Sequence, residues 1–200
     1  MTEAEAPVRR MSAEQRRDEV VRAAGTVFGR NGYAGTTTDQ VARAAGISQP
    51  YVVRMFGSKE TLFLEVLDRA EHALLAAFRT ALEQHRSTGR PRDVLEADLG
   101  DAYTALIADD GIHLPLMHGF LEGEDPAVGP KARSGFLRVW GFLVEEAGLT
   151  RDEAARFLGF GMLINVVLGL RMSVDPDPEA RRLVDAACGP AAADVRRRDA

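Results

Sequence analysis

The chain has 200 residues, 46% of them hydrophobic, which suits one or two small globular domains with a real core. Its single cysteine, Cys188, excludes an internal disulfide and a cysteine-based zinc site, and fits a reducing cytoplasm. No apolar run reaches the roughly 20 residues that a membrane helix needs, and the first residues lack the apolar segment of a secretory signal. We therefore expect a cytoplasmic protein that does not enter a membrane.

The net charge of −5 argues at first against a nucleic-acid partner, but the charge is unevenly distributed. From Arg9 to Lys59, nine Arg and Lys residues stand against four Asp and Glu residues, a local charge of +5 that leaves −10 for the rest. A basic segment on an acidic body suits local contact with phosphates. Chance clustering of the basic residues is the alternative.

Apolar residues recur at helical spacing along the chain, and no convincing strand alternation is present. Ser12 begins a first helix with a capping box, and this helix ends at Gly32. Thr37 begins a second, short helix in the same way, which ends at Gly46. Ser48 begins a third helix, with Pro50 in its first turn, where a missing N–H has little consequence.

The glycine turn between the second and third helices has the geometry of a helix-turn-helix, which lays its second helix in the major groove of DNA. A long fourth helix follows over about residues 59–85 and keeps one apolar stripe. We expect further helices over about residues 94–108, 114–121, 131–147 and 151–172, and a short one ending near Cys188. The sequence thus predicts an all-α protein. It has a flexible arm over 1–11, a helix-turn-helix domain over 12–58, a larger helical domain over 59–188 and a disordered tail over 189–200.

Three segments carry a resemblance to a known family: GRNGY, TTTDQVARAAGIS and QPYVVRMFGSKETLF. Residues 12–67 resemble the DNA-binding head of TetR-family transcriptional repressors, and the FGSKE junction is specific because a generic helix-turn-helix does not need it. The motifs cover about a quarter of the chain, and the other helices agree with the family in number and length only. The resemblance implies that residues 59–188 form a ligand-binding and dimerisation domain, and that the protein is not an enzyme.

The candidate DNA contacts lie at the starts of the second, third and fourth helices. Helix N-termini and hydroxyl groups hold phosphates, and a lysine can pair with another phosphate. In the third helix, Gln49 can contact adenine, Pro50 can pack on a thymine methyl, and Arg54 can read guanine or clamp a phosphate. Tyr51 shares a face with Arg54, although packing is the alternative for it. The resemblance implies contacts at these positions, and the full set is Thr37, Thr38, Ser48, Gln49, Pro50, Tyr51, Arg54 and Lys59.

Two positions depart from the family pattern. Relatives often carry a phosphate-contacting tyrosine where this chain has Val53. Asp39 places a negative charge in the first turn of the second helix, close to the expected phosphate, but it also suits the helix dipole and can serve as a cap.

The best candidate for a dimer interface is the pair of long helices over about residues 131–147 and 151–172. Residues 157–170 of the second helix are apolar nearly all round and include three glycines. Such a helix needs cover on more than one side, which favours a dimer interface over burial within one bundle. The resemblance also implies a homodimer with its interface here, and the candidate residues are Phe157, Phe160, Gly161, Ile164 and Leu168.

A ligand pocket is implied by the resemblance more than by the residues. The candidates mix aromatic, methionine and polar side chains, as apolar ligand sites do. They are Tyr103, Leu106, Met117, His118, Phe120, Leu121, Trp140, Leu143 and Asn165. Plain core is the alternative for each of them. His113 and His118 are five residues apart, which is poor helical spacing for a shared metal, so we expect no metal and no cofactor.

These features predict a homodimeric repressor that binds a palindromic operator in double-stranded DNA and is released by a largely apolar small molecule. The bound effector would tilt the long fourth helix and change the separation of the two heads. An activator role stays open, as does an architectural DNA-binding protein of the same fold without an effector. The third alternative, an enzyme or carrier that uses the bundle cavity, lacks a nucleophile–base pair, a metal spacing and a glycine-rich phosphate loop.

Overall fold

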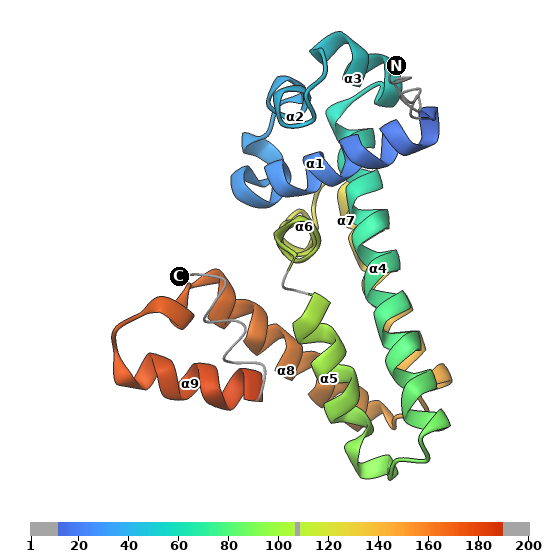
Figure 1. The fold of residues 1–200 in the computed structure, drawn as a ribbon, viewed down its shortest axis with the longest axis vertical. Coiled ribbons are helices and arrows are strands. Elements are labelled where there is room, and N and C mark those ends of the chain that lie inside the picture. Colours follow the sequence, from blue (N-terminus) through green and yellow to red (C-terminus); the bar gives the residue numbers. More distant parts are fainter. Residues whose placement is uncertain (1–11, 107–108, 190–200) are drawn as a thin grey trace, which may run out of the picture.

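The computed structural model describes residues 12–106 and 109–189, and this part of the chain is helical throughout, without strands. A head of three helices sits on one end of a long helix, and the remaining helices form a body along and beside it (Figure 1). The all-α fold predicted from the sequence is confirmed. The predicted arm over 1–11 lies outside the described residues, as does the predicted tail apart from Gly189.

The head consists of α1 (Ala13–Gly35), α2 (Thr38–Ala44) and α3 (Gln49–Phe56). The predicted capping boxes at Ser12 and Thr37 are both formed. Gly32 adopts a positive φ of 72° and breaks the helical path near the end of α1, where the sequence predicts a stop. The helices hold together through one apolar core, whose fully buried members include Val20, Phe28, Val41, Val52 and Phe63.

The long helix α4 (Lys59–Ser87) joins the head to the body. Its first turns contribute Leu62, Phe63 and Val66 to the core of the head, and its later turns contribute Leu74 and Phe78 to the core of the body. At 1.5 Å per residue its 29 residues span about 44 Å. Both cores therefore share one continuous element.

Eight shorter elements complete the body: η1 (Arg92–Val94), α5 (Leu95–Leu106), α6 (Asp110–Leu121), α7 (Val128–Gly141), η2 (Phe142–Glu146), α8 (Arg151–Gly169), η3 (Met172–Val174) and α9 (Pro178–Cys188). Two helices begin earlier than the sequence predicts. Asp109 caps α6 by accepting from the backbone N–H of Gly111. Asp125 lies two residues before the N-cap of α7, Ala127, and its Oδ1 accepts from the backbone N–H groups of Ala127 and Val128 at 2.9 and 2.8 Å. Neither aspartate is part of a capping-box pattern, so the sequence does not predict these two helix starts.

Helix α6 lies beneath α1, between the head and the rest of the body (Figure 1). The two helices cross very closely, because a Cβ built on Gly25 of α1 would lie 2.5 Å from the carbonyl oxygen of Gly111. Residue 25 must therefore be a glycine for this crossing to form. Among residues 12–106 and 109–189, no helix combines the length and apolarity that crossing a membrane would need.

Candidate functional site

The exposed face of helix α3 is polar, and its opposite face packs in the core of the head. Val52 and Phe56 are buried in the core of the head, whereas Ser48, Gln49 and Pro50 are exposed. The Ser48 hydroxyl makes no capping hydrogen bond to α3, so the helix starts without it. A packed underside with an exposed N-terminal end is what a recognition helix requires.

The starts of α2 and α3 are joined by side chains. Gln49 donates from Nε2 to the hydroxyl oxygen of Thr38 at 3.2 Å. The Thr37 hydroxyl oxygen accepts from the backbone N–H of Gln40 as part of the capping box. The structure thus brings three predicted contact residues together at one edge of the head.

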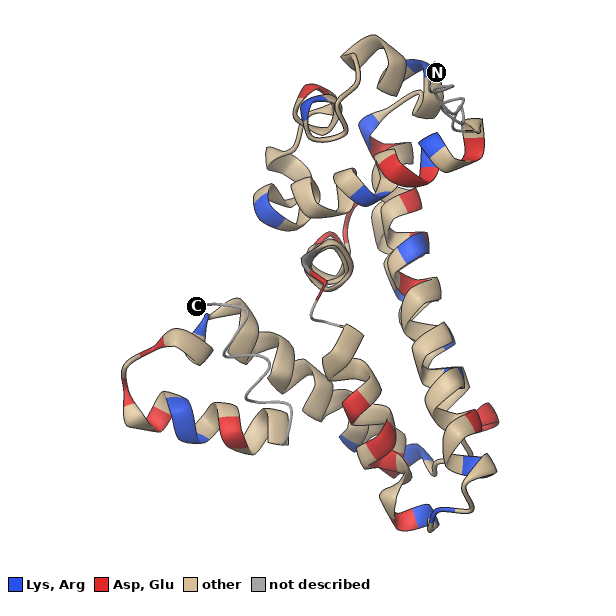
Figure 2. Ribbon diagram, in the orientation of Figure 1, with Lys and Arg blue, Asp and Glu red and all other residues tan. Residues whose placement is uncertain are grey.

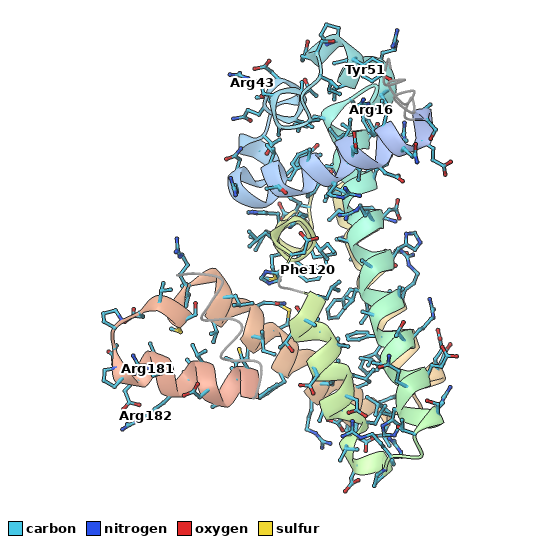
Figure 3. All side chains as sticks on the ribbon, in the orientation of Figure 1. Arg16, Arg43, Tyr51, Phe120, Arg181 and Arg182 are labelled. Carbon is cyan, nitrogen blue, oxygen red and sulfur yellow. The ribbon has the colours of Figure 1, made fainter. Side chains whose placement is uncertain are left out.

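Tyr51 and Arg54 form a pair one turn apart on α3. The guanidinium carbon of Arg54 lies 4.8 Å from the centre of the Tyr51 ring, a cation–π geometry. Figure 3 shows Tyr51 at the outer end of the head. Val53 beside them is 39% exposed, so an apolar surface stands where relatives often carry a tyrosine.

Lys59 is engaged within the chain. Its Nζ donates to the carbonyl oxygen of Tyr33 at 2.9 Å and lies 4.7 Å from the centre of the Tyr33 ring. A lysine near these last carbonyls of α1 suits the negative end of the helix dipole. The first residue of α4 therefore holds the end of α1 in place.

The charge on Asp39 has a partner on its own helix. Arg43, four residues on, forms an exposed ion pair with it, and Figure 3 shows Arg43 on the outer side of α2. Helix α3 carries one basic residue, Arg54, and no acidic one (Figure 2). The negative charge at the start of α2 is thus compensated locally.

The body contains a cavity with about 820 Å³ of empty space, counting the part that opens to solvent. Five helices, α4 to α8, contribute to its walls, and most of the lining side chains are apolar, among them Leu74, Phe78, Leu116, Phe136 and Met162. Its mostly apolar walls with a few polar groups are the lining that small-molecule sites use.

Four of the nine predicted pocket residues line this cavity: Tyr103, Met117, Phe120 and Asn165. The other five lie elsewhere, and the prediction is corrected for them. Leu143 is fully buried in the packed core, and Trp140 and Leu106 pack against that core. Leu121 is 80% exposed at the end of α6. His118 faces the head, where its Nε2 is 3.1 Å from the carbonyl oxygen of Gly29.

Several lining residues were missed because they come from elements remote in the sequence. Glu71 and Lys131 line one side of the cavity, and His113 lies on another with Tyr103 and Asn165. The Asn165 side-chain oxygen accepts from the Tyr103 hydroxyl and lies 2.9 Å from Nε2 of His113. Burial raises the pKa of Tyr103 to about 12, so its hydroxyl keeps its proton at neutral pH. Within residues 12–106 and 109–189, no three or more His, Cys, Asp or Glu side chains group as a metal site would need.

The predicted dimer residues on α8 face in different directions. Phe160 is 52% exposed, but Phe157 and Gly161 line the cavity, Ile164 is buried, and Leu168 packs against the cluster under α9. Helical spacing could not separate these faces, because apolar residues occupy all of them. The exposed large apolar residues of α7, α8 and their flank are Phe136, Leu137, Phe160, Leu163, Val166 and Leu170.

The sequence matches the family described as "Bacterial regulatory proteins, tetR family" over residues 20–66, the segment from α1 to the start of α4. The HTH-type transcriptional activator FasR of Mycolicibacterium smegmatis is 36% identical over 88 residues, 44% of this chain and 39% of that protein. The HTH-type transcriptional repressor NicS of Pseudomonas putida is 36% identical over 61 residues, 30% of this chain and 29% of that protein. The chain therefore spans less than half the length of these two relatives. Both are named as transcriptional regulators.

Solved structures extend the similarity of fold to the body. The TetR family transcriptional regulator PfmR from Thermus thermophilus superposes with a TM-score of 0.58 at 19% identity, over 89% of this chain and 97% of that one. The multidrug binding protein EbrR, solved with imidazole, gives 0.56 at 21% identity, over 86% and 94%. Residues 20–66 are thus similar to the tetR family of bacterial regulatory proteins, and the rest of the described chain shares its fold with these solved structures.

Proposed function

We propose that the protein is a homodimeric, sequence-specific transcriptional regulator, a repressor that a small molecule releases from its operator. The observation that carries the proposal is the exposed face of α3, on which Gln49, Tyr51 and Arg54 stand above a packed core. Gln49 suits adenine and Arg54 suits guanine or a phosphate. Thr37 and Thr38 at the start of α2, together with Ser48 and Pro50, complete the contact surface.

The dimer would form through the exposed apolar face of α7 and α8. Leu137, Phe160, Leu163, Val166 and Leu170 are large apolar side chains exposed to water, and apolar surface of this kind suits a protein interface. Two copies joined there would present two α3 helices to a palindromic site, spaced by about one helical turn. These residues replace Phe157, Gly161, Ile164 and Leu168 in the proposed interface.

Effector binding would reach the head through α6 as well as α4. Helix α6 lines the cavity with His113, Met117 and Phe120 and bonds α1 through His118. An effector that fits the cavity better in a DNA-incompetent arrangement would shift the population away from the DNA-bound form. EbrR, named as a multidrug binding protein, supports a small-molecule site in this fold.

The test is footprinting and fluorescence anisotropy on the DNA that flanks the gene for this protein. A reporter gene placed behind the promoter in that DNA measures the effect on transcription. We expect a palindromic footprint, a dimer by light scattering, and a log–log salt slope of roughly −0.9 per phosphate neutralised. A lack of specific binding at moderate salt would reject the regulator. The named relatives include a repressor and an activator, so rising reporter output on deletion of the gene supports repression, and falling output rejects it.

A further inference from the structure

The polar groups of the cavity lie in two places, one around Asn165 and one around Glu71. Among the described residues, the side-chain N–H group of Asn165 has no strong hydrogen-bond acceptor. Asn165 is only 5% exposed, and its side-chain oxygen accepts from Tyr103 and His113. The oxygen end of the amide therefore faces Tyr103 and His113. The amide nitrogen must then point the other way.

The amide nitrogen of Asn165 meets a weak partner there. Its contact is the thioether sulfur of Met162, 3.6 Å away, and both residues line the cavity. A thioether is a poor acceptor, and a buried N–H donor with poor compensation is unfavourable. A ligand oxygen placed in the cavity would replace the sulfur with a better acceptor.

The other polar place in the cavity carries balanced charge. Both carboxylate oxygens of Glu71 accept from Arg138, and Lys131 lies 3.9 Å from Glu71. Lys131 is in turn paired with Asp68. Neither an anion nor a cation would find an unpaired countercharge among these four groups, and desolvating a charged ligand in an otherwise apolar cavity is costly.

We propose that the effector is an uncharged, largely apolar molecule with a hydrogen-bond acceptor, such as a ketone or ester oxygen, which binds the side-chain N–H of Asn165. This inference rests on the proposed function for the role of the cavity, but it concerns binding alone. Asn165 recognises the acceptor directly, and Tyr103 and His113 orient its amide.

The probes are four compounds of similar shape: butyrophenone, which carries a ketone, butylbenzene, 4-phenylbutanoate and 4-phenylbutylamine. Calorimetry on the DNA-free 200-residue protein at neutral pH compares wild type with Asn165→Leu, which keeps the branched shape of the side chain and removes both polar atoms. We expect Asn165→Leu to weaken butyrophenone roughly tenfold and to leave butylbenzene within about twofold. Arg182→Ala, at an exposed residue of α9 outside the cavity, is the control and should leave butyrophenone binding within about twofold of wild type. The two charged probes should bind wild type at least about tenfold more weakly than butyrophenone.

If Asn165→Leu does not fold by circular dichroism, Tyr103→Phe takes its place. It removes one of the donors that orient the amide, and should weaken butyrophenone roughly threefold without affecting butylbenzene. A merely structural role for Tyr103 would change both probes alike.

The proposal is overturned if a charged probe binds as tightly as butyrophenone, if the folded variant weakens both neutral probes equally, or if butyrophenone fails to bind wild type up to its solubility limit. These measurements contain no DNA. If the protein binds its operator but shows no preference for the acceptor probe, the proposed ligand class is wrong and the proposed regulatory function stands. If the protein shows that preference but binds no operator, the proposed regulatory function is wrong.

Discussion

His118 in α6 donates from Nε2 to the carbonyl oxygen of Gly29 in α1 across 3.1 Å, so a helix that lines the body cavity is hydrogen-bonded to the head. Because a carbonyl can only accept, the hydrogen resides on Nε2 of the imidazole. The contact lies beside a crossing close enough to exclude a side chain at Gly25. Movement of α6 therefore cannot leave α1 undisturbed.

Replacing Gly25 by alanine tests this crossing. The new Cβ would lie 2.5 Å from the carbonyl oxygen of Gly111, which is backbone and cannot swing away. We expect Gly25→Ala to lower the free energy of unfolding by about 1–3 kcal/mol, measured in urea. Gly100→Ala is the control, since a Cβ there meets nothing within 4 Å in helix α5, and it should raise stability by about 0.5–1 kcal/mol. Equal effects of the two substitutions would contradict the close crossing.

Arg54→Ala should weaken operator binding by about 1–3 kcal/mol without lowering the melting temperature, because the side chain is exposed and lies over the Tyr51 ring. Anisotropy titration on the footprinted site measures the loss. The control is Arg182→Ala, which removes an exposed arginine of α9 that is paired with Glu179. If both variants bind the operator like wild type, α3 does not read DNA through Arg54.

Lys59→Met separates a structural role from a phosphate contact. The Nζ group bonds the carbonyl of Tyr33 and lies over its ring, so the DNA-free protein should lose about 1 kcal/mol of stability. Lys131→Met does not serve as a control for the loss of a lysine, because Lys131 forms an ion pair with Asp68 in the body. Should Lys59→Met weaken DNA binding with no change in unfolding, the contact with the end of α1 has no energetic role.

Tyr103 predicts a pH dependence at the alkaline end. Its pKa of about 12 in the folded protein lies above its ordinary value of 10.0, and burial is the main cause. Below pH 10 the hydroxyl is protonated in both states, so its contribution to stability is complete there. As pH rises from 10 towards 12 the unfolded state ionises first, and up to about 2 kcal/mol is lost. Urea unfolding between pH 9 and 11.5 should show a smaller loss in Tyr103→Phe, and parallel profiles would refute the shift.

Glu71 and Arg138 predict a strong coupling in a double-mutant cycle. Glu71 is buried and Arg138 binds both of its carboxylate oxygens. Arg138→Met alone strands a buried carboxylate and should cost about 2–4 kcal/mol, whereas Glu71→Gln with Arg138→Met should cost less than the sum of the two single changes. Additive effects in chemical denaturation would mean that the pair is solvated in solution.

The head could be predicted in detail because its signals are local. The capping residues Ser12 and Thr37 and the break at Gly32 act within a few residues of themselves, and each lies where the sequence places it. The cavity could be predicted only in part. Trp140 and Asn165 both stand on largely apolar helices, but one faces the core and the other the cavity, and that choice depends on partners 50 or more residues away, as in the contact of His113 with Asn165. The role of His118 could not be predicted for the same reason, because its partner Gly29 is 89 residues earlier in the sequence.

The bond from Lys59 to the end of α1 makes the head and the first turn of α4 one rigid unit, and α4 then acts as a lever arm. Over its length of about 44 Å, a tilt of only 5° at the body end displaces the other end by roughly 4 Å. Two such arms in a dimer would change the distance between their recognition helices by up to about twice that amount. A shift of this size is comparable to the rise of two base pairs, roughly 7 Å, so a contact change too small to remodel the cavity is enough to take two heads out of register with the grooves.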